Sequence, residues 1–95
     1  MRLTEQQQQV IRTAIHGRDP EAQIILFGSR VHDEARGGDI DLLILSDKIS
    51  FHDEWGIRRD ILDRIGWQKL DLIVRKPSRI LDAISQCAME SGVRL

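Results

Sequence analysis

Two aspartates one residue apart, Asp39 and Asp41, have the type and spacing of side chains that hold a metal ion. They open the apolar run 40–45, and side chains of a strand alternate between its two faces, so both carboxylates point the same way. Along a strand they would lie roughly 6–7 Å apart, which suits acids that converge on one or two cations. Carboxylate oxygens together with water are the ligands that Mg²⁺ prefers.

A glycine–serine pair, Gly28-Ser29, follows the earlier apolar run 24–27. Glycine lets the backbone come close to a ligand, and Ser29 can open a helix. The free N–H groups at a helix N-terminus favour phosphate. A phosphate cradle and a pair of metal-binding acids together indicate chemistry on a nucleoside triphosphate.

Gly28-Ser29 followed by Asp39-x-Asp41 resembles the signature of the nucleotidyltransferase superfamily that includes DNA polymerase beta. The chain looks most like its minimal members, the MntA-type proteins encoded beside HEPN-domain toxins. The likeness extends to Arg30 and to Ala35-Arg36. Gly28-Ser29 alone, or Asp39-x-Asp41 alone, would be weak evidence for this family. Both motifs at this spacing, each at the end of an expected strand, make a strong signal.

The resemblance implies Mg²⁺ as cofactor, ATP as substrate and a third acid on the strand expected over 70–74. An ionised carboxylate within such an apolar run is costly unless it is paired or hydrogen-bonded. Asp71 occupies the matching position, where it would join the metal site or take the proton of an attacking hydroxyl. The other interpretation is an edge-strand aspartate that faces water or pairs with Lys69. The residues implied to act are Asp39, Asp41 and Asp71 for metal and catalysis, and Gly28, Ser29 and Arg30 for the triphosphate.

The implied function is transfer of AMP from ATP to a hydroxyl of a HEPN-domain toxin, so that this chain would act as the antitoxin. Where the family often reads Ala-Arg-Gly, this chain reads Val31-His32-Asp33. That change favours a first alternative, an antitoxin or subunit that binds nucleotide but silences its partner by contact alone. A second alternative is nucleotidyl transfer to RNA or to a small molecule.

Composition limits the partners. Ninety-five residues predict one minimal nucleotidyltransferase domain over 1–95, with apolar helix faces that favour association with a HEPN protein or with itself. A net charge of −1 gives no basic field for direct binding of nucleic acid. The single cysteine fits a reduced, cytoplasmic setting, and no apolar run approaches the roughly 20 residues that cross a membrane.

Periodicity predicts an α/β fold in the order helix, strand, short helix, strand, helix, strand, helix, with helices packed on a small mixed sheet. Thr4 with Gln7 predicts the start of the first helix, and Ser50 with Asp53 the start of another. A short helical connection is expected over 30–36.

The C-terminal region is expected to form a helix from Pro77-Ser78 to Gly92, followed by a short edge strand at Val93–Leu95. Cys87 lies on the apolar stripe of that helix and is expected to be a small core residue. Trp55, on the preceding helix, is likewise expected to pack rather than to serve as a platform for a base.

Overall fold

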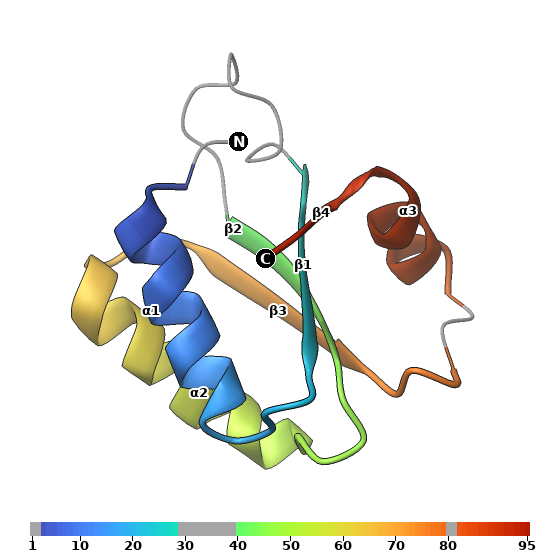
Figure 1. Cartoon of the computed structure of the whole chain (residues 1–95), viewed down its shortest axis with the longest axis horizontal. Helices are drawn as coiled ribbons and strands as arrows, with labels where there is room; N and C mark the ends of the chain where they lie inside the picture. The colour runs from blue at the N-terminus through green and yellow to red at the C-terminus, as the bar shows by residue number, and fades with distance from the viewer. Residues whose placement is uncertain (1–2, 29–39, 80–81) are drawn as a thin grey trace.

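The computed structural model describes residues 3–28, 40–79 and 82–95. Within them the chain forms α1 (Glu5–His16), β1 (Gln23–Phe27), β2 (Ile40–Leu45), α2 (Phe51–Ile65), β3 (Leu70–Arg75), α3 (Ala83–Ser91) and β4 (Val93–Arg94) (Figure 1). The short helical connection expected over 30–36 lies outside the described residues.

The four strands form one mixed sheet in the order β3-β2-β1-β4. Strand β1 is antiparallel to both β2 and β4, whereas β2 and β3 run parallel. A parallel pair requires a crossover connection, and α2 supplies it. The predicted α/β fold with a small mixed sheet is confirmed, and so is the short C-terminal strand.

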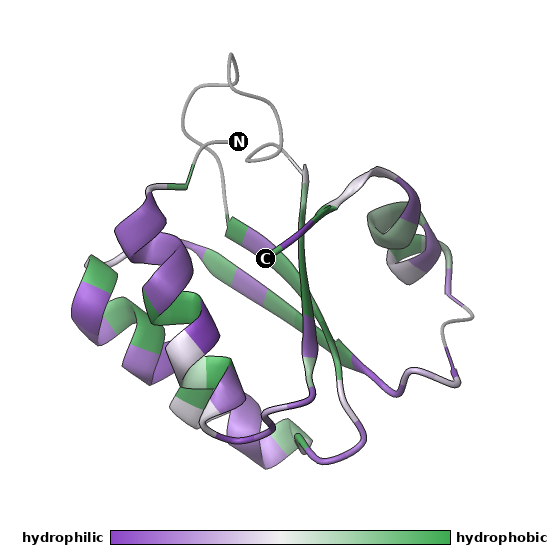
Figure 2. Ribbon diagram, in the orientation of Figure 1, coloured by the Kyte–Doolittle hydropathy of each residue, from purple (hydrophilic) through white to green (hydrophobic). Residues whose placement is uncertain are grey.

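Helices cover both faces of the sheet, but unequally. Helices α1 and α2 lie on one face, where Ile11, Ile15, Ile57 and Ile61 are fully buried against the central strands (Figure 1). Among the helices that the structure describes, the nine-residue α3 is the one that packs on the other face, through Ala88. Figure 2 shows that β1 and β2 are hydrophobic along most of their length, because residues of both faces are buried there.

Both predicted helix starts are confirmed. The Thr4 hydroxyl accepts the N–H of Gln7 at 3.0 Å, and the Gln7 side chain accepts the N–H of Thr4. Ser50 and Asp53 form the same reciprocal arrangement at the start of α2. Each pair satisfies backbone donors that the first helical turn leaves without partners.

The predicted start of the last helix at Pro77-Ser78 is wrong. Helix α3 begins at Ala83, where the Asp82 carboxylate accepts the backbone N–H of Ser85 at 3.3 Å. Asp82 also pairs with the Arg75 guanidinium at 3.1 Å, which ties the start of α3 to the end of β3. Hydrogen bonds from Ser85 and from Arg75 lower the pKa of Asp82 to about 2. The helix therefore begins after the capping residue Asp82 and not at the proline.

Two side chains expected in the core are exposed. Trp55 retains 65% of its accessible surface, because it lies on the side of α2 that faces neither the sheet nor α1. Cys87 is also exposed, since α3 turns Ala88 toward the sheet instead. On the same helices Ile57, Ile61 and Ala88 are fully buried, so the expectation fails for these two side chains and not for the packed side as a whole.

A buried polar network joins the turn after α1 to the turn after β2. The Ser46 hydroxyl donates to Asp19 Oδ2 at 2.5 Å and accepts the N–H groups of Lys48 and Ile49 at 3.0 Å each. Asp19 Oδ1 accepts the N–H of Glu21. The bond from Ser46, and then the bond from Glu21, lower the pKa of the Asp19 carboxyl group.

We expect Ser46→Ala to lower the free energy of unfolding by about 2 kcal/mol at neutral pH, because buried donors and an acceptor lose their partner. The stabilisation from a lowered carboxyl pKa is present above the ordinary Asp value of 3.8 and is lost as pH falls through the folded value. The difference in free energy of unfolding between the wild type and Ser46→Ala should therefore become smaller below pH 3.8. Urea unfolding at several pH values, with the exposed Ser78→Ala as control, measures it. A difference that stays constant with pH would contradict this role of Asp19.

Candidate functional site

Two aspartates from neighbouring strands lie side by side at one end of the sheet. Asp41 on β2 is directly opposite Asp71 on the parallel strand β3. Alternation places Asp41 on the same face as Leu43 and Asp71 on the same face as Ile73, both of which pack in the core beneath α3. Neighbouring strands are about 4.8 Å apart, so one ligand can meet both carboxylates.

Gly28 brings the end of β1 against Asp41. Its φ of 78° lies in the left-handed region, and Asp41 is paired with the preceding residue, Phe27. A Cβ atom on residue 28 would overlap the carboxylate of Asp41. Both the backbone conformation and the space therefore require glycine here.

The donor set at this end of the sheet fits a hard divalent cation. Asp41 and Asp71 supply carboxylate oxygens on a common face, and both side chains are half-buried rather than fully sequestered. Across 3–28, 40–79 and 82–95, three or more metal-ligating side chains do not gather at one point. The third predicted ligand, Asp39, lies outside the described residues.

Sequence reasoning placed six residues at the site, and the structure describes three of them. Gly28, Asp41 and Asp71 lie at the same end of the sheet, with Gly28 against Asp41 and Asp71 in register with Asp41. The part of Asp71 in catalysis stays a prediction. Ser29, Arg30 and Asp39 fall outside the described residues, and their roles also stay predictions.

One positioning residue was missed. Arg58 on α2 donates from Nη1 to the carbonyl oxygen of Leu70 at 2.6 Å, directly before Asp71. This bond fixes the start of β3 and hence the backbone that carries Asp71. The two residues are far apart in sequence and belong to different elements, so no local pattern predicts their contact.

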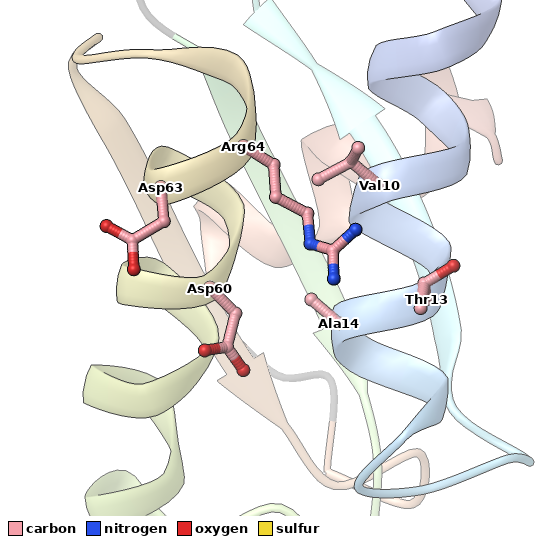
Figure 3. A pocket seen from close by; sticks show the side chains of 6 residues that line it. All are labelled: Val10, Thr13, Ala14, Asp60, Asp63 and Arg64. Atoms are coloured by element: carbon pink, nitrogen blue, oxygen red, sulfur yellow. The ribbon is translucent and has the colours of Figure 1, made fainter.

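A hollow of about 430 Å³ lies between α1 and α2, on the face of the sheet opposite to Asp41 and Asp71 (Figure 3). Arg64 extends from α2 across it toward α1, and Asp60 on its rim pairs with Arg18 at 3.2 Å. The charged residues that line this hollow, Asp60, Asp63 and Arg64, all belong to α2, and Asp60 is already paired with Arg18, so we take Asp41 and Asp71 as the candidate site.

The comparison with protein families agrees with this geometry. Residues 9–92 match the model of the nucleotidyltransferase domain, and the chain belongs to that family. No curated protein sequence matches the chain significantly. Among the described helices, none combines the length and the apolar character that a membrane crossing requires.

We expect Gly28→Ala to impair transfer more than stability. The left-handed backbone costs an L-residue roughly 1–2 kcal/mol, and the new methyl group must also displace the Asp41 carboxylate. Gly66→Ala is the matched control, because Gly66 has a φ of 89° but nothing within 4 Å of the added atom. Thermal unfolding should register strain in both variants, and the transfer rate should fall only in Gly28→Ala. An equal loss of rate in both would contradict the contact with Asp41.

Proposed function

We propose that this chain transfers AMP from ATP to a hydroxyl group of a partner protein, a HEPN-domain toxin that is silenced by the modification. Membership of the nucleotidyltransferase family supports the reaction type. The observation that carries the assignment is the juxtaposition of Asp41 and Asp71 beside Gly28. The resemblance to MntA-type proteins supports the choice of a protein acceptor.

Asp39 and Asp41 would hold Mg²⁺, with Asp71 beside them to act on the acceptor hydroxyl. When bound, the cation supplies charge neutralisation for the triphosphate and for the attacking and leaving oxygens. Gly28, with Ser29 and Arg30, would orient the phosphates through close backbone approach and hydrogen bonds.

The transfer is a displacement at the α-phosphorus. The acceptor oxygen forms a bond to that phosphorus while the bond between it and the bridging oxygen to the β-phosphate breaks. Pyrophosphate leaves, and the proton of the acceptor hydroxyl passes to the carboxylate of Asp71. Asp71 is suited to this because it lies on an edge strand next to Asp41.

The openness of the sheet supports a large acceptor. The face that carries both acids is covered in the described residues by α3 alone, and that helix exposes Ile84 and Met89. A protein surface can approach such a face. A chain with a net charge of −1 has no excess of positive charge to attract the phosphates of RNA.

The test is incubation of the chain with ATP, Mg²⁺ and a HEPN-domain protein, should one be encoded beside it, followed by intact mass measurement of both proteins. A mass gain of one or more AMP units on the partner, together with loss of its toxicity, supports the proposal. Transfer to added RNA or to a small molecule, with the partner unchanged, would contradict it.

The alternative is an antitoxin that acts by contact alone, and the unusual segment Val31-His32-Asp33 favours it. This candidate predicts an inhibited partner of unchanged mass. Asp41→Asn separates the two, because it should abolish silencing in the first case and leave it intact in the second.

A further inference from the structure

A hollow of about 490 Å³ lies beside the first half of α2, where the turn after α1 meets that helix. Its lining residues are Arg18 from the turn and His52, Asp53, Trp55, Gly56 and Arg59 from α2. Residues three and four apart share one side of a helix, so Trp55, Gly56 and Arg59 form a single flank. The acids of the candidate site lie on the opposite face of the sheet, so this hollow is separate from them.

Arg18 is held in place by one part of its guanidinium and keeps donors on the other. Its Nη1 donates to the Ala14 carbonyl oxygen at 3.3 Å and to Asp60 Oδ2 at 3.2 Å. The next residue, Asp19, fixes the backbone through its buried bond with Ser46. Among the described residues, none accepts a hydrogen bond from Nε or Nη2 of Arg18. The guanidinium therefore offers a pre-positioned pair of donors to a ligand.

Gly56 makes room for this guanidinium in the interior of a helix. A Cβ atom on residue 56 would overlap Arg18 Nη2, so the guanidinium lies directly over the α2 backbone. Glycine inside a helix is less favourable than alanine, because it loses more backbone freedom on folding. The close approach of Arg18 is the structural reason for a glycine at this position.

Trp55 supplies an aromatic face beside Arg18. It precedes Gly56 on α2 and retains 65% of its accessible surface. Arg59 lies one turn further along the same flank, and its side chain is 72% exposed. An exposed indole beside two guanidinium groups favours a planar ligand that stacks on the ring.

The charges around the hollow balance, which disfavours a simple anion site. Arg18 and Arg59 both face Asp60, at 3.2 and 3.8 Å. Asp53 accepts from Ser50 N and Ser50 Oγ through Oδ2, which leaves Oδ1 without a hydrogen-bond partner among the described residues. Hydrogen bonds from Ser50, and then the charge of Arg18, lower the pKa of the Asp53 carboxyl group. A well-matched ligand would therefore offer acceptors to Arg18 and a donor to Asp53.

We propose that this hollow binds the guanine base of a free nucleotide. Guanine presents two adjacent acceptors, O6 and N7, which is the pattern that an arginine reads with two donors. Its opposite edge carries N–H donors, which the carboxylate of Asp53 accepts. Adenine carries an amino group next to N7, so it offers Arg18 one acceptor instead of two. The purine ring stacks on the indole of Trp55.

The ligand is a free nucleotide because the chain has no field that attracts a long polyanion. Its net charge is −1, and the two arginines of the hollow are matched by Asp53 and Asp60. Recognition then depends on the base and little on the phosphate. The inference goes beyond the proposed function and does not depend on it, since the hollow contains neither Asp41 nor Asp71.

Fluorescence of Trp55 tests the site in a Trp67→Phe background, because the chain contains two tryptophans. GMP, titrated in the presence of chelator, should quench this fluorescence, and guanosine should bind within a few-fold of GMP. AMP should bind about tenfold more weakly or worse, as expected for a lost hydrogen bond to a charged group.

Four results of these titrations would overturn the inference. They are no quenching at millimolar GMP, equal binding of AMP and GMP, tighter binding of CMP than of GMP, and displacement of GMP by ribose 5-phosphate. A single-stranded RNA with one guanine that binds more than about tenfold tighter than GMP would overturn the assignment to a free nucleotide.

Gly56→Ala separates binding from stability. The added methyl group would push the end of the Arg18 side chain aside, and alanine favours a helix more than glycine does. The thermal midpoint should therefore stay the same or rise, whereas GMP affinity should fall about tenfold or more, the scale of a lost bidentate contact. Unchanged GMP affinity in this variant would overturn the inference.

Arg18→Lys removes the paired donors and keeps the charge next to Asp60. It should also weaken GMP about tenfold or more. Arg64→Lys, on the same helix but at the hollow between α1 and α2, is the matched control and should leave GMP affinity unchanged. Equal GMP affinity in Arg18→Lys and Arg64→Lys would overturn the inference.

Discussion

Asp41→Asn is expected to lower nucleotidyl transfer by about 1,000-fold, since several kcal/mol of transition-state stabilisation depend on the charge of the metal ligands. Without metal, the same variant should unfold at an unchanged or higher temperature. Asp41 lies directly opposite Asp71, and like charges opposite one another on neighbouring strands destabilise a sheet. Transfer assays with saturating ATP, together with thermal unfolding in chelator, measure the two effects.

Asp63→Asn is the matched control, because Asp63 lines the hollow between α1 and α2, on the opposite face of the sheet from Asp41. It should leave transfer unchanged. The double variant Asp39→Asn with Asp41→Asn should abolish transfer entirely. A marked loss of metal-free stability in Asp41→Asn would show that this carboxylate is structural, and the assignment of the site would fail.

Asp71→Asn is expected to separate metal binding from proton transfer. If Asp39 and Asp41 supply most of the ligands, the variant should bind ATP with Mg²⁺ within a few-fold of wild type. Its transfer to the partner should fall about 100-fold, the lower end of the range for a lost acid–base group. Equilibrium ATP binding and single-turnover transfer, measured on the same preparation, give the two quantities.

The possible results assign Asp71 a role without ambiguity. Loss of ATP binding as severe as in Asp41→Asn would make Asp71 a metal ligand instead of a proton acceptor. Unchanged transfer would make it a strand residue that faces water. Asp41 and Asp71 are register partners, so both lie at the same level of the sheet. Whether Asp71 binds the metal or accepts a proton therefore depends on where its carboxylate points.

The positions of Asp41 and Asp71 within their strands were predictable from sequence, because they depend on local hydrophobic patterning. Asp41 and Asp71 are each the one acid within a short apolar run. Such a run predicts a buried strand, and the acid is then the second residue of that strand. Gly28 was predictable because its turn follows directly after such a run. The neighbouring positions of these residues then follow from the strand order of the family fold.

The fold was less predictable where two helix faces compete. Trp55 and Cys87 fall on the apolar stripes of their helices, yet the sheet is contacted by Ile57 and Ala88. Which side of a helix packs depends on its distance from the sheet and on its neighbours, neither of which is a local property of sequence. The start of α3 at Ala83 depends likewise on Asp82 meeting Arg75, a contact between two elements.

The pairing of β4 with β1 has a kinetic consequence. The Leu95 N–H bonds to Ile24 O at 2.9 Å, and a Cβ on Gly92 would lie 2.5 Å from the Ile25 side chain, so the chain end is seated against one of the first strands. Closure of so long a loop costs entropy before it gains contacts, which favours late docking. Helix α3 and β4 should then open and reclose as one cooperative unit, with α3 amides exchanging hydrogen faster than those of α1 and α2. Each opening would uncover more of the sheet face that carries Asp41 and Asp71, so the rate of opening would set how often the whole of that face is accessible.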